Sequence, residues 1–347
     1  MADGLYRIGI VGATSLVGKE LSDELQESLL AASDFVLLDD EEEATGVVAS
    51  VGDEAAFVQR IDSGSFDRMD FVFFAGNAAS TLKHWPAAKK AGVSSIDLTY
   101  ALEQETGVPV RAPFVADAMK KRAEGQPTLE TASVVSAHPA AVMLAAVAAR
   151  LQAGLAVESF AAVVMEPASQ YGREAMDELH QQTVNLLSFK DLPKEQYDAQ
   201  VAFNLLPSLG EDAKVKLAES ENRIRRHYGA IGGLPTLEVQ LIQAPVFHGY
   251  VASVLVELKA EATAAEVETA LMGESIDVVT DESDPPSNLS AAGQEDIMVR
   301  VRGAAGVGVR SRRFWLWMAV DNLKLTALNA ISCANELRRL RPSGKVQ

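Results

Sequence analysis

The first half of the chain alternates short apolar runs with segments of helical periodicity. Helical patterns cover residues 16–30 and 78–91. The apolar runs have the length of buried strands, and they occur at residues 7–11, 34–38, 71–74, 93–98 and 133–135. Strands that are apolar throughout and separated by helices predict a parallel sheet covered on both faces. The fold class of this half is therefore α/β.

The second half has a different pattern. Extended segments rich in β-branched residues cover residues 159–165 and 237–258. Helical patterns stand apart from them, at residues 140–153, 172–188, 211–227, 263–272 and 322–340. Long strands beside separate helices predict an α+β domain on a mixed or antiparallel sheet. Residues 281–295 are rich in Asp, Ser, Pro and Gly, which predicts a surface loop.

These patterns divide the chain into two domains. We assign residues 1–136 to the first domain and residues 137–321 to the second. The C-terminal segment, residues 322–347, contains the last helix and is expected to complete the first domain.

A glycine-punctuated turn follows the first strand and opens the first helix. It reads Gly12-Ala13-Thr14-Ser15-Leu16-Val17-Gly18. In this context glycines let the backbone approach a pyrophosphate, whose charge meets the helix N-terminus. A serine at position 15 stands where glycine is usual; its Cβ should crowd the phosphate, although its hydroxyl can donate a hydrogen bond. The pattern indicates a Rossmann-type dinucleotide site, and the alternative is a relic loop that only packs.

Acidic residues end the second strand. Asp39 lies 21 residues after Gly18, and Asp40 follows it. A carboxylate at this place bonds the ribose diol of NAD and repels the additional 2′-phosphate of NADP. Residues 41–43, all glutamate, would add to that repulsion. We therefore expect NAD to be favoured over NADP, and a solvated acidic turn is the alternative.

Composition narrows the class of protein. The formal net charge of -17 argues against nucleic acid, because binding to phosphates requires Lys and Arg. The single cysteine fits a reducing compartment. Residues 1–7 lack the pattern of a signal peptide, and charges or glycines interrupt every apolar run before it could cross a membrane. We expect a cytoplasmic protein that binds neither nucleic acid nor membranes.

Several segments resemble the aspartate-semialdehyde dehydrogenase family over nearly the full length. Besides residues 12–18, the similar segments are Phe73-Phe74-Ala75-Gly76, Ile96-Asp97, and residues 172–179, 202–207, 244–249 and 316–323. The resemblance implies a second domain that holds the catalytic groups and a homodimer interface. It also implies that Asn322 lies near the nicotinamide and that a small molecule binds in the interdomain cleft. The apolar strands of the second domain also favour a partner surface.

The catalytic positions of the resemblance are occupied by other residues. The family's nucleophilic cysteine corresponds to Ala141, its glutamine to Ala168 and its substrate-binding arginine to Gln243. Its histidine corresponds to Tyr250, and its phosphate-binding arginine to Glu103. Alanine cannot form the thiohemiacetal and acyl-thioester of that reaction. Glutamine in place of the arginine, without the cysteine, is also found in the family's divergent Usg-like branch, which this chain resembles.

Three other residues map near the altered site. His138, His248 and Glu166 can serve in acid–base chemistry or, together, as metal ligands. The alternative is two histidines with structural roles, and no spacing of the His-x-x-x-His kind points to a metal. We therefore predict no metal site.

Three hypotheses follow. In the first, the protein is an NAD-binding-fold homodimer without the phosphorylating reaction and acts by binding a ligand or partner. In the second, it is an oxidoreductase with non-covalent hydride chemistry. In the third, it retains aspartate-semialdehyde dehydrogenase activity.

Overall fold

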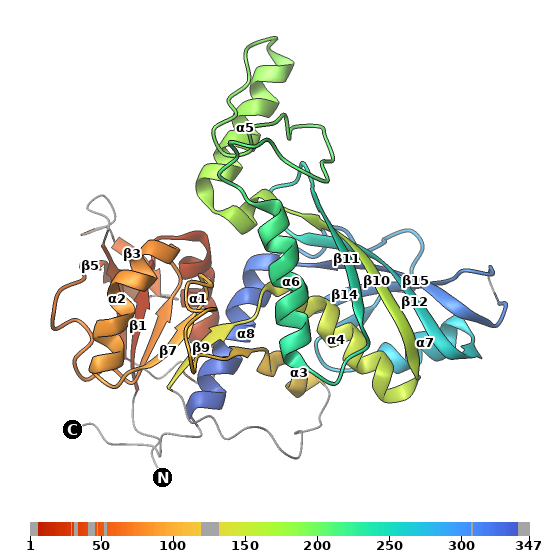
Figure 1. Cartoon of the computed structure of the whole chain (residues 1–347), viewed down its shortest axis with the longest axis horizontal. Coiled ribbons are helices and arrows are strands. Elements are labelled where there is room, and N and C mark those ends of the chain that lie inside the picture. Colours follow the sequence, from red (N-terminus) through yellow and green to blue (C-terminus); the bar gives the residue numbers. More distant parts are fainter. Residues whose placement is uncertain are drawn as a thin grey trace. The chain divides into compact units, whose positions relative to one another are not determined.

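The chain forms two compact units in a computed structural model (Figure 1). The structure describes residues 6–28, 30, 34–40, 46, 48–51, 54–118, 132–306 and 308–338. Among these, the first unit comprises residues 6–114, 132–137 and 326–338, and the second comprises residues 115–118 and 138–325. No helix in the described residues has a stretch long and apolar enough to span a membrane.

The first unit is built on a seven-stranded sheet in which every pair of strands is parallel, as the apolar runs predicted. In spatial order the strands are β5 (Gln59–Arg60), β2 (Asp34–Asp39), β1 (Arg7–Val11), β6 (Phe71–Phe74), β7 (Ser94–Asp97), β9 (Ser133–Ser136) and β8 (Val110–Arg111). Its helices are α1 (Leu16–Glu27), α2 (Ala78–Lys90) and most of α8 (Asn322–Arg338), and α3 (Pro113–Ala118) begins in it. A separate antiparallel pair joins β3 (Val48–Val51) and β4 (Glu54–Phe57).

Alternation along the strands gives this sheet two apolar faces. Ile8, Ile10 and Phe73 contribute to a core that includes residues of α1 and α8. Val72 and Phe74 point the other way, into a core that includes Trp85 of α2. Helices therefore cover both faces of the sheet.

The second unit contains a six-stranded mixed sheet. In spatial order its strands are β11 (Leu237–Gln243), β10 (Val157–Glu166), β12 (Tyr250–Ala262), β15 (Ser311–Val320), β14 (Ile297–Gly303) and β13 (Ile276–Val278). The outer pairs, β10 with β11 and β13 with β14, are parallel, and the inner pairs are antiparallel. The other elements are α4 (Pro139–Gly154), η1 (Ala168–Tyr171), α5 (Arg173–Leu187), α6 (Leu217–Ile231) and α7 (Ala264–Leu271).

One face of this second sheet is buried beneath helices. α4 contacts β10, α6 contacts β11 and α7 contacts β14, and α4 also contacts both of the other helices. Phe160 of β10 stacks on Tyr228 of α6 within this layer. On β15, Phe314 and Leu316 are fully buried on the same face. In Figure 1, α5 and the loop after it extend away from the sheet.

Two predicted elements are corrected by the structure. The helix expected at 211–227 begins only at Leu217 and ends at Ile231. Its start is delayed because the Val215 N–H donates to the Gln196 carbonyl at 3.0 Å and holds the preceding segment in a loop. The extended segment 237–258 is two strands. Pro245, which lacks an amide hydrogen, and Gly249, at φ +85°, lie in the turn between them. Residues 281–295 form a loop, as predicted.

Candidate functional site

The glycine turn of the first unit is formed by close backbone packing. Gly12 has φ +80°, and a Cβ at this position would lie 2.2 Å from the Gly76 Cα. A Cβ at Gly18 would lie 2.2 Å from the Gly12 carbonyl oxygen. Ala13 and Ala75 belong to the buried core beside these contacts. Gly12 and Gly18 are therefore required by contact between backbone segments, and a Cβ at Gly76 would lie 3.1 Å from the Gly12 Cα.

Ser15 joins the turn to the sheet. It is the N-cap of α1, where its hydroxyl accepts the Gly18 N–H at 2.8 Å. The same hydroxyl donates to the Ala75 carbonyl at 2.7 Å. Its hydrogen is therefore committed to the protein, contrary to the expectation that it can donate to a phosphate. Leu16 begins α1, and Val17 packs against the core of the unit.

Asp39 lies at the carboxyl end of β2 and is only 5% exposed. Its Oδ2 accepts the Thr14 hydroxyl at 3.1 Å, and its Oδ1 accepts the Asp40 N–H at 2.9 Å. The Asp39 carboxylate, which the sequence predicts to bind the ribose of NAD, is thus hydrogen-bonded to Thr14 of the glycine turn.

The Asp40 carboxylate has hydrogen-bonding and cationic partners on α2, which the acidic pattern of the sequence did not predict. Its carboxylate accepts the Ser80 hydroxyl at 3.0 Å and the Lys83 ammonium at 3.1 Å, and the His84 Nε2 lies 3.2 Å away. Burial acts to raise the pKa of Asp40, but hydrogen bonds from Lys83, Ser80 and His84 outweigh it and lower that pKa. The i, i+3, i+4 spacing of the three partners was a signal available in the sequence. The glutamates at 41–43 lie outside the described residues.

A buried polar cluster lies where three strands of the second unit meet. Glu166 ends β10, Gln243 ends β11 and Tyr250 begins β12, and all three are 0% exposed. The Tyr250 hydroxyl donates to Glu166 Oε1 at 3.4 Å. Gln243 Nε2 donates to the carbonyls of Glu166 and Ala244, each at 3.1 Å. The structure therefore brings together three residues that the family resemblance had placed at or near the altered site.

Burial raises the pKa of Glu166 to about 8. The hydroxyls of Tyr171 and Tyr250 and the charge of Arg223 lower the pKa by less than burial raises it. Within the described residues, Glu166 Oε2 and Gln243 Oε1 have no hydrogen-bond partner. At neutral pH Glu166 is consequently a neutral acid that can donate a proton. Tyr171 acts on this cluster from η1 and Arg223 from α6.

His138 has a structural role at the start of α4. Its ring Nδ1 accepts the Ala140 N–H at 3.3 Å, and its backbone N–H donates to His227 Nδ1 at 2.9 Å. Its ring lies 6.1 Å from that of Tyr250, centroid to centroid, and its Nε2 lies 3.4 Å from Gln170 Nε2. His138 therefore adjoins the cluster through Tyr250.

His248 does not join this group. It lies in the turn before β12, and in the described part of the chain it makes no hydrogen bond or ion pair. No set of three His, Cys, Asp or Glu side chains in that part is arranged to hold a metal ion. His138, His248 and Glu166 are not brought together as a set of this kind.

The remaining sequence candidates occupy ordinary structural positions. Ala141 lies in α4 and Ala168 begins η1, and both are fully buried. Asn322 begins α8, where its Oδ1 accepts the Ser169 hydroxyl at 3.1 Å and the Gly249 N–H at 3.0 Å. Glu103 lies partly exposed in a turn of the first unit, with its N–H directed to the Tyr100 carbonyl.

Comparison with known proteins identifies the family. Residues 7–123 match the semialdehyde dehydrogenase NAD-binding domain, and residues 144–325 match the semialdehyde dehydrogenase dimerisation domain. The chain belongs to the semialdehyde dehydrogenase family. A USG-1 protein homolog of Pseudomonas aeruginosa is 31% identical, over 93% of this chain and 95% of that protein. An aspartate-semialdehyde dehydrogenase of Rickettsia bellii is 25% identical, over 96% of this chain and 97% of that protein.

Solved structures of the family have the same fold. That of a probable aspartate-semialdehyde dehydrogenase from Pseudomonas aeruginosa is 30% identical, with a TM-score of 0.83 over 96% of this chain and 99% of that one. That of aspartate semialdehyde dehydrogenase II from Vibrio cholerae has a TM-score of 0.81 at 22% identity, covering 96% and 99%. The USG-1 homologs, at 28–31% identity, place the chain with the Usg-like branch of the semialdehyde dehydrogenases.

The single cysteine of this chain, Cys333, lies in a packed core. Cys333 is 1% exposed in α8 and packs in the core of the first unit. Its Sγ lies 3.8 Å from the Arg111 carbonyl. Burial raises the pKa of this thiol far above its ordinary value, so the nucleophilic thiolate does not form at neutral pH.

Proposed function

We propose that this protein is an NAD-binding homodimer that has lost the phosphorylating dehydrogenase reaction and acts by binding a ligand or a partner. The observation that carries the proposal is the lack of a nucleophilic thiol: the chain has one cysteine, and it is buried and uncharged in a helix core. Without a thiolate, an aldehyde cannot be held as the covalent adduct from which hydride leaves. Loss of such a nucleophile lowers the rate by roughly a thousandfold or more.

The other altered positions support the same proposal. Gln243 carries no charge with which to pair a substrate carboxylate, and both hydrogens of its amide are directed to backbone carbonyls. Tyr250 is bonded to Glu166 and is fully buried. Neither residue offers the cation or the base that the covalent reaction needs. An assay for phosphate-dependent reduction of NAD or NADP by aspartate semialdehyde tests this part of the proposal.

One observation favours a second candidate function, an oxidoreductase without a covalent intermediate. Glu166 is a neutral acid at pH 7, and its Oε2 makes no hydrogen bond within the described residues. Such a carboxyl group can transfer a proton to the oxygen of a carbonyl group whose carbon receives hydride from the reduced nicotinamide. If the protein is such an oxidoreductase, Glu166→Gln abolishes its turnover. If it acts only by binding, the wild-type protein already has no turnover.

Cofactor binding gives the first testable prediction. NAD should raise the melting temperature, because a ligand that binds only the folded state stabilises it, by about 2.7 kcal/mol at one hundred times its dissociation constant. NADP should raise it less, because its 2′-phosphate would approach the Asp39 carboxylate. Asp39→Ser should narrow the difference between the two cofactors, as measured by differential scanning fluorimetry.

The matched control is Thr14→Val. It removes the hydroxyl that Asp39 accepts at 3.1 Å but leaves the carboxylate charge in place. The preference for NAD should therefore persist in this variant. Equal and negligible shifts with millimolar NAD and NADP would reduce the glycine turn to a packing element. A larger shift with NADP would show that Asp39 does not face the ribose.

A further inference from the structure

Helix α2 of the first unit is cationic and begins beside the glycine turn. It contains three lysines and a histidine but no acidic residue, although the chain has a formal net charge of -17. The helix begins two residues after Gly76, where a Cβ would lie 3.1 Å from the Gly12 Cα. Its first turn is therefore tied to the backbone segment that is proposed to hold the pyrophosphate of a dinucleotide.

The glycine turn itself has a backbone donor without a partner. Within the described residues, the Thr14 N–H takes part in no hydrogen bond. Helix α1 begins two residues later, at Leu16. A free amide hydrogen next to a helix N-terminus is suited to binding a pyrophosphate oxygen.

One lysine of α2 is paired with an acid at the end of β2. Lys83 Nζ lies 3.1 Å from Asp40 Oδ2, and no other partner of Lys83 exists among the described residues. Its side chain is 64% exposed. The ammonium group is thus held by a single carboxylate and otherwise lies in solvent. The lysine chain has four rotatable carbon–carbon bonds, so an ammonium released from this carboxylate can move several ångströms.

The two acids at the end of β2 differ in access. Asp39 is buried, and its two carboxylate oxygens accept hydrogen bonds from Thr14 and from the Asp40 N–H. The side chain of Asp40 is 18% exposed. In Rossmann-type folds, residues at this end of the second strand face the adenosine ribose, whose 2′-oxygen carries the additional phosphate of NADP. The pair of Asp40 and Lys83 therefore lies one residue beyond the predicted ribose contact.

The charges of the three groups separate two explanations of cofactor preference. With His84 left aside, Asp39, Asp40 and Lys83 together carry one negative charge. Neutralising either acid brings this total to zero, but only the loss of the Asp40 charge also releases Lys83. Simple repulsion of the 2′-phosphate therefore predicts similar effects for the two acids, whereas a released cation predicts different ones.

We propose that Asp40 sets the preference for NAD by keeping Lys83 from the 2′-phosphate of NADP. The inference rests on the proposed binding of a dinucleotide at the glycine turn, and it names the residue pair that discriminates between the two cofactors. While the pair is intact, the ammonium is engaged and the 2′-phosphate meets a carboxylate. When position 40 is neutral, Lys83 can bind the phosphate, as lysines do in other phosphate sites.

Isothermal titration of the intact protein with NAD and with NADP tests this role. Asp40→Asn retains the shape of the side chain and removes its charge. It should lower the dissociation constant of NADP by about tenfold or more, the effect of one hydrogen bond between charged groups. The affinity for NAD should stay nearly unchanged, because NAD has no 2′-phosphate. Adding Lys83→Met to Asp40→Asn should abolish the gain in NADP affinity.

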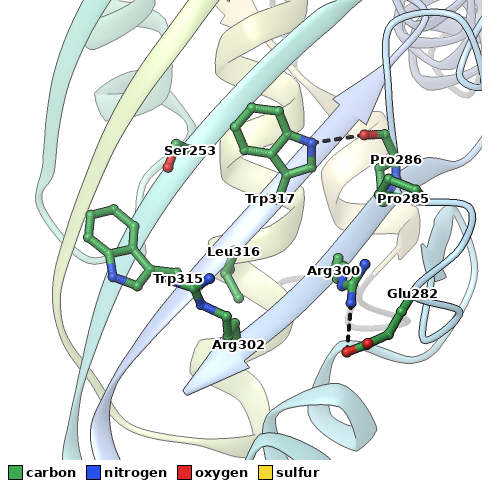
Figure 2. A pocket seen from close by; sticks show the side chains of 9 residues that line it. All are labelled: Ser253, Glu282, Pro285, Pro286, Arg300, Arg302, Trp315, Leu316 and Trp317. Atoms are coloured by element: carbon green, nitrogen blue, oxygen red, sulfur yellow. Dashed lines mark hydrogen bonds and ion pairs between the residues drawn. The ribbon is translucent and has the colours of Figure 1, made fainter. Parts of the chain in front are cut away.

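Two control variants remove the same amount of charge. Asp39→Asn leaves Lys83 paired with Asp40, so it should raise the affinity for NADP less than Asp40→Asn does. Glu282→Gln releases a different cation, because Glu282 lies 3.2 Å from Arg300 where both line a pocket of the second unit (Figure 2). Glu282→Gln should change the affinity for neither cofactor.

The possible results distinguish this inference from the proposed cofactor binding. Equal NADP affinities of Asp40→Asn and of its double variant with Lys83→Met would overturn the role of Lys83, since lost repulsion alone would then explain any gain. An equal gain from Asp39→Asn would overturn it as well. Binding of NAD shows that Asp40→Asn is folded, and Asp40→Ser replaces it if that binding is lost. If neither cofactor binds to the wild type or to any variant at millimolar concentration, the proposed dinucleotide binding itself is wrong.

Discussion

Replacing Gly12 by alanine should destabilise the first unit by about 3 kcal/mol or more. Two costs add at this position. The backbone has φ +80°, a conformation that costs a residue with a side chain roughly 1–2 kcal/mol. The new Cβ would also lie 2.2 Å from the Cα and 2.3 Å from the amide nitrogen of Gly76, and overpacking of this kind costs about 1–3 kcal/mol. Denaturation in urea measures the effect.

Gly92 provides the control for the backbone cost alone. It belongs to the same unit and has φ +74°, but a Cβ there would meet no atom within 4 Å. Gly92→Ala should therefore cost only about 1–2 kcal/mol. Equal losses in the two variants would mean that the turn moves freely away from Gly76. It would then not be the tightly packed loop described above.

Replacing Glu166 by glutamine should stabilise the protein at alkaline pH. The pKa of the folded-state carboxyl is about 8, above the ordinary value of 4.5. Between these values the folded protein holds a proton that the unfolded chain has released, so stability falls as pH rises. The slope for one group is about 1.4 kcal/mol per pH unit at most. Glu166→Gln removes this loss, so its advantage over the wild type should grow from near zero at pH 5 to a few kcal/mol at pH 8.

Tyr250→Phe is the companion variant. The Tyr250 hydroxyl donates a hydrogen bond to Glu166 Oε1 and lowers the pKa of that carboxyl. Removing the hydroxyl should raise this pKa, so the loss of stability with rising pH should continue to a higher pH than in the wild type. Free energies of unfolding across pH 5–9 measure both effects. A wild-type curve that matches that of Glu166→Gln over this range would contradict a buried acid at position 166.

The features predicted correctly from sequence are those set by neighbouring residues. The glycine turn follows β1 directly, and the apolar strands fix the parallel sheet, so local pattern was sufficient. The partners of the Asp40 carboxylate were not predicted, because Lys83 and His84 come from a helix more than forty residues later.

The buried cluster of the second unit depends on tertiary structure. Glu166, Gln243 and Tyr250 come from the ends of three strands, and only the register of β10 with β11 and β12 brings them together. Sequence alone grouped His248 with Glu166 because both map near the site. The turn that Gly249 makes before β12 leaves His248 without a polar contact in the described residues. The ends of strands in different parts of a chain carry no local signal of their proximity.

The most direct test of the account is an assay of the purified protein with aspartate semialdehyde, phosphate and either NAD or NADP. The absorbance of reduced nicotinamide should not rise above the rate without enzyme. It should not rise in Ala141→Cys either, because Gln243 and Tyr250 still lack the cation and the base of the covalent reaction. Phosphate-dependent turnover by the wild type above about 1 per second, a low value for an enzyme, would contradict the loss of this chemistry.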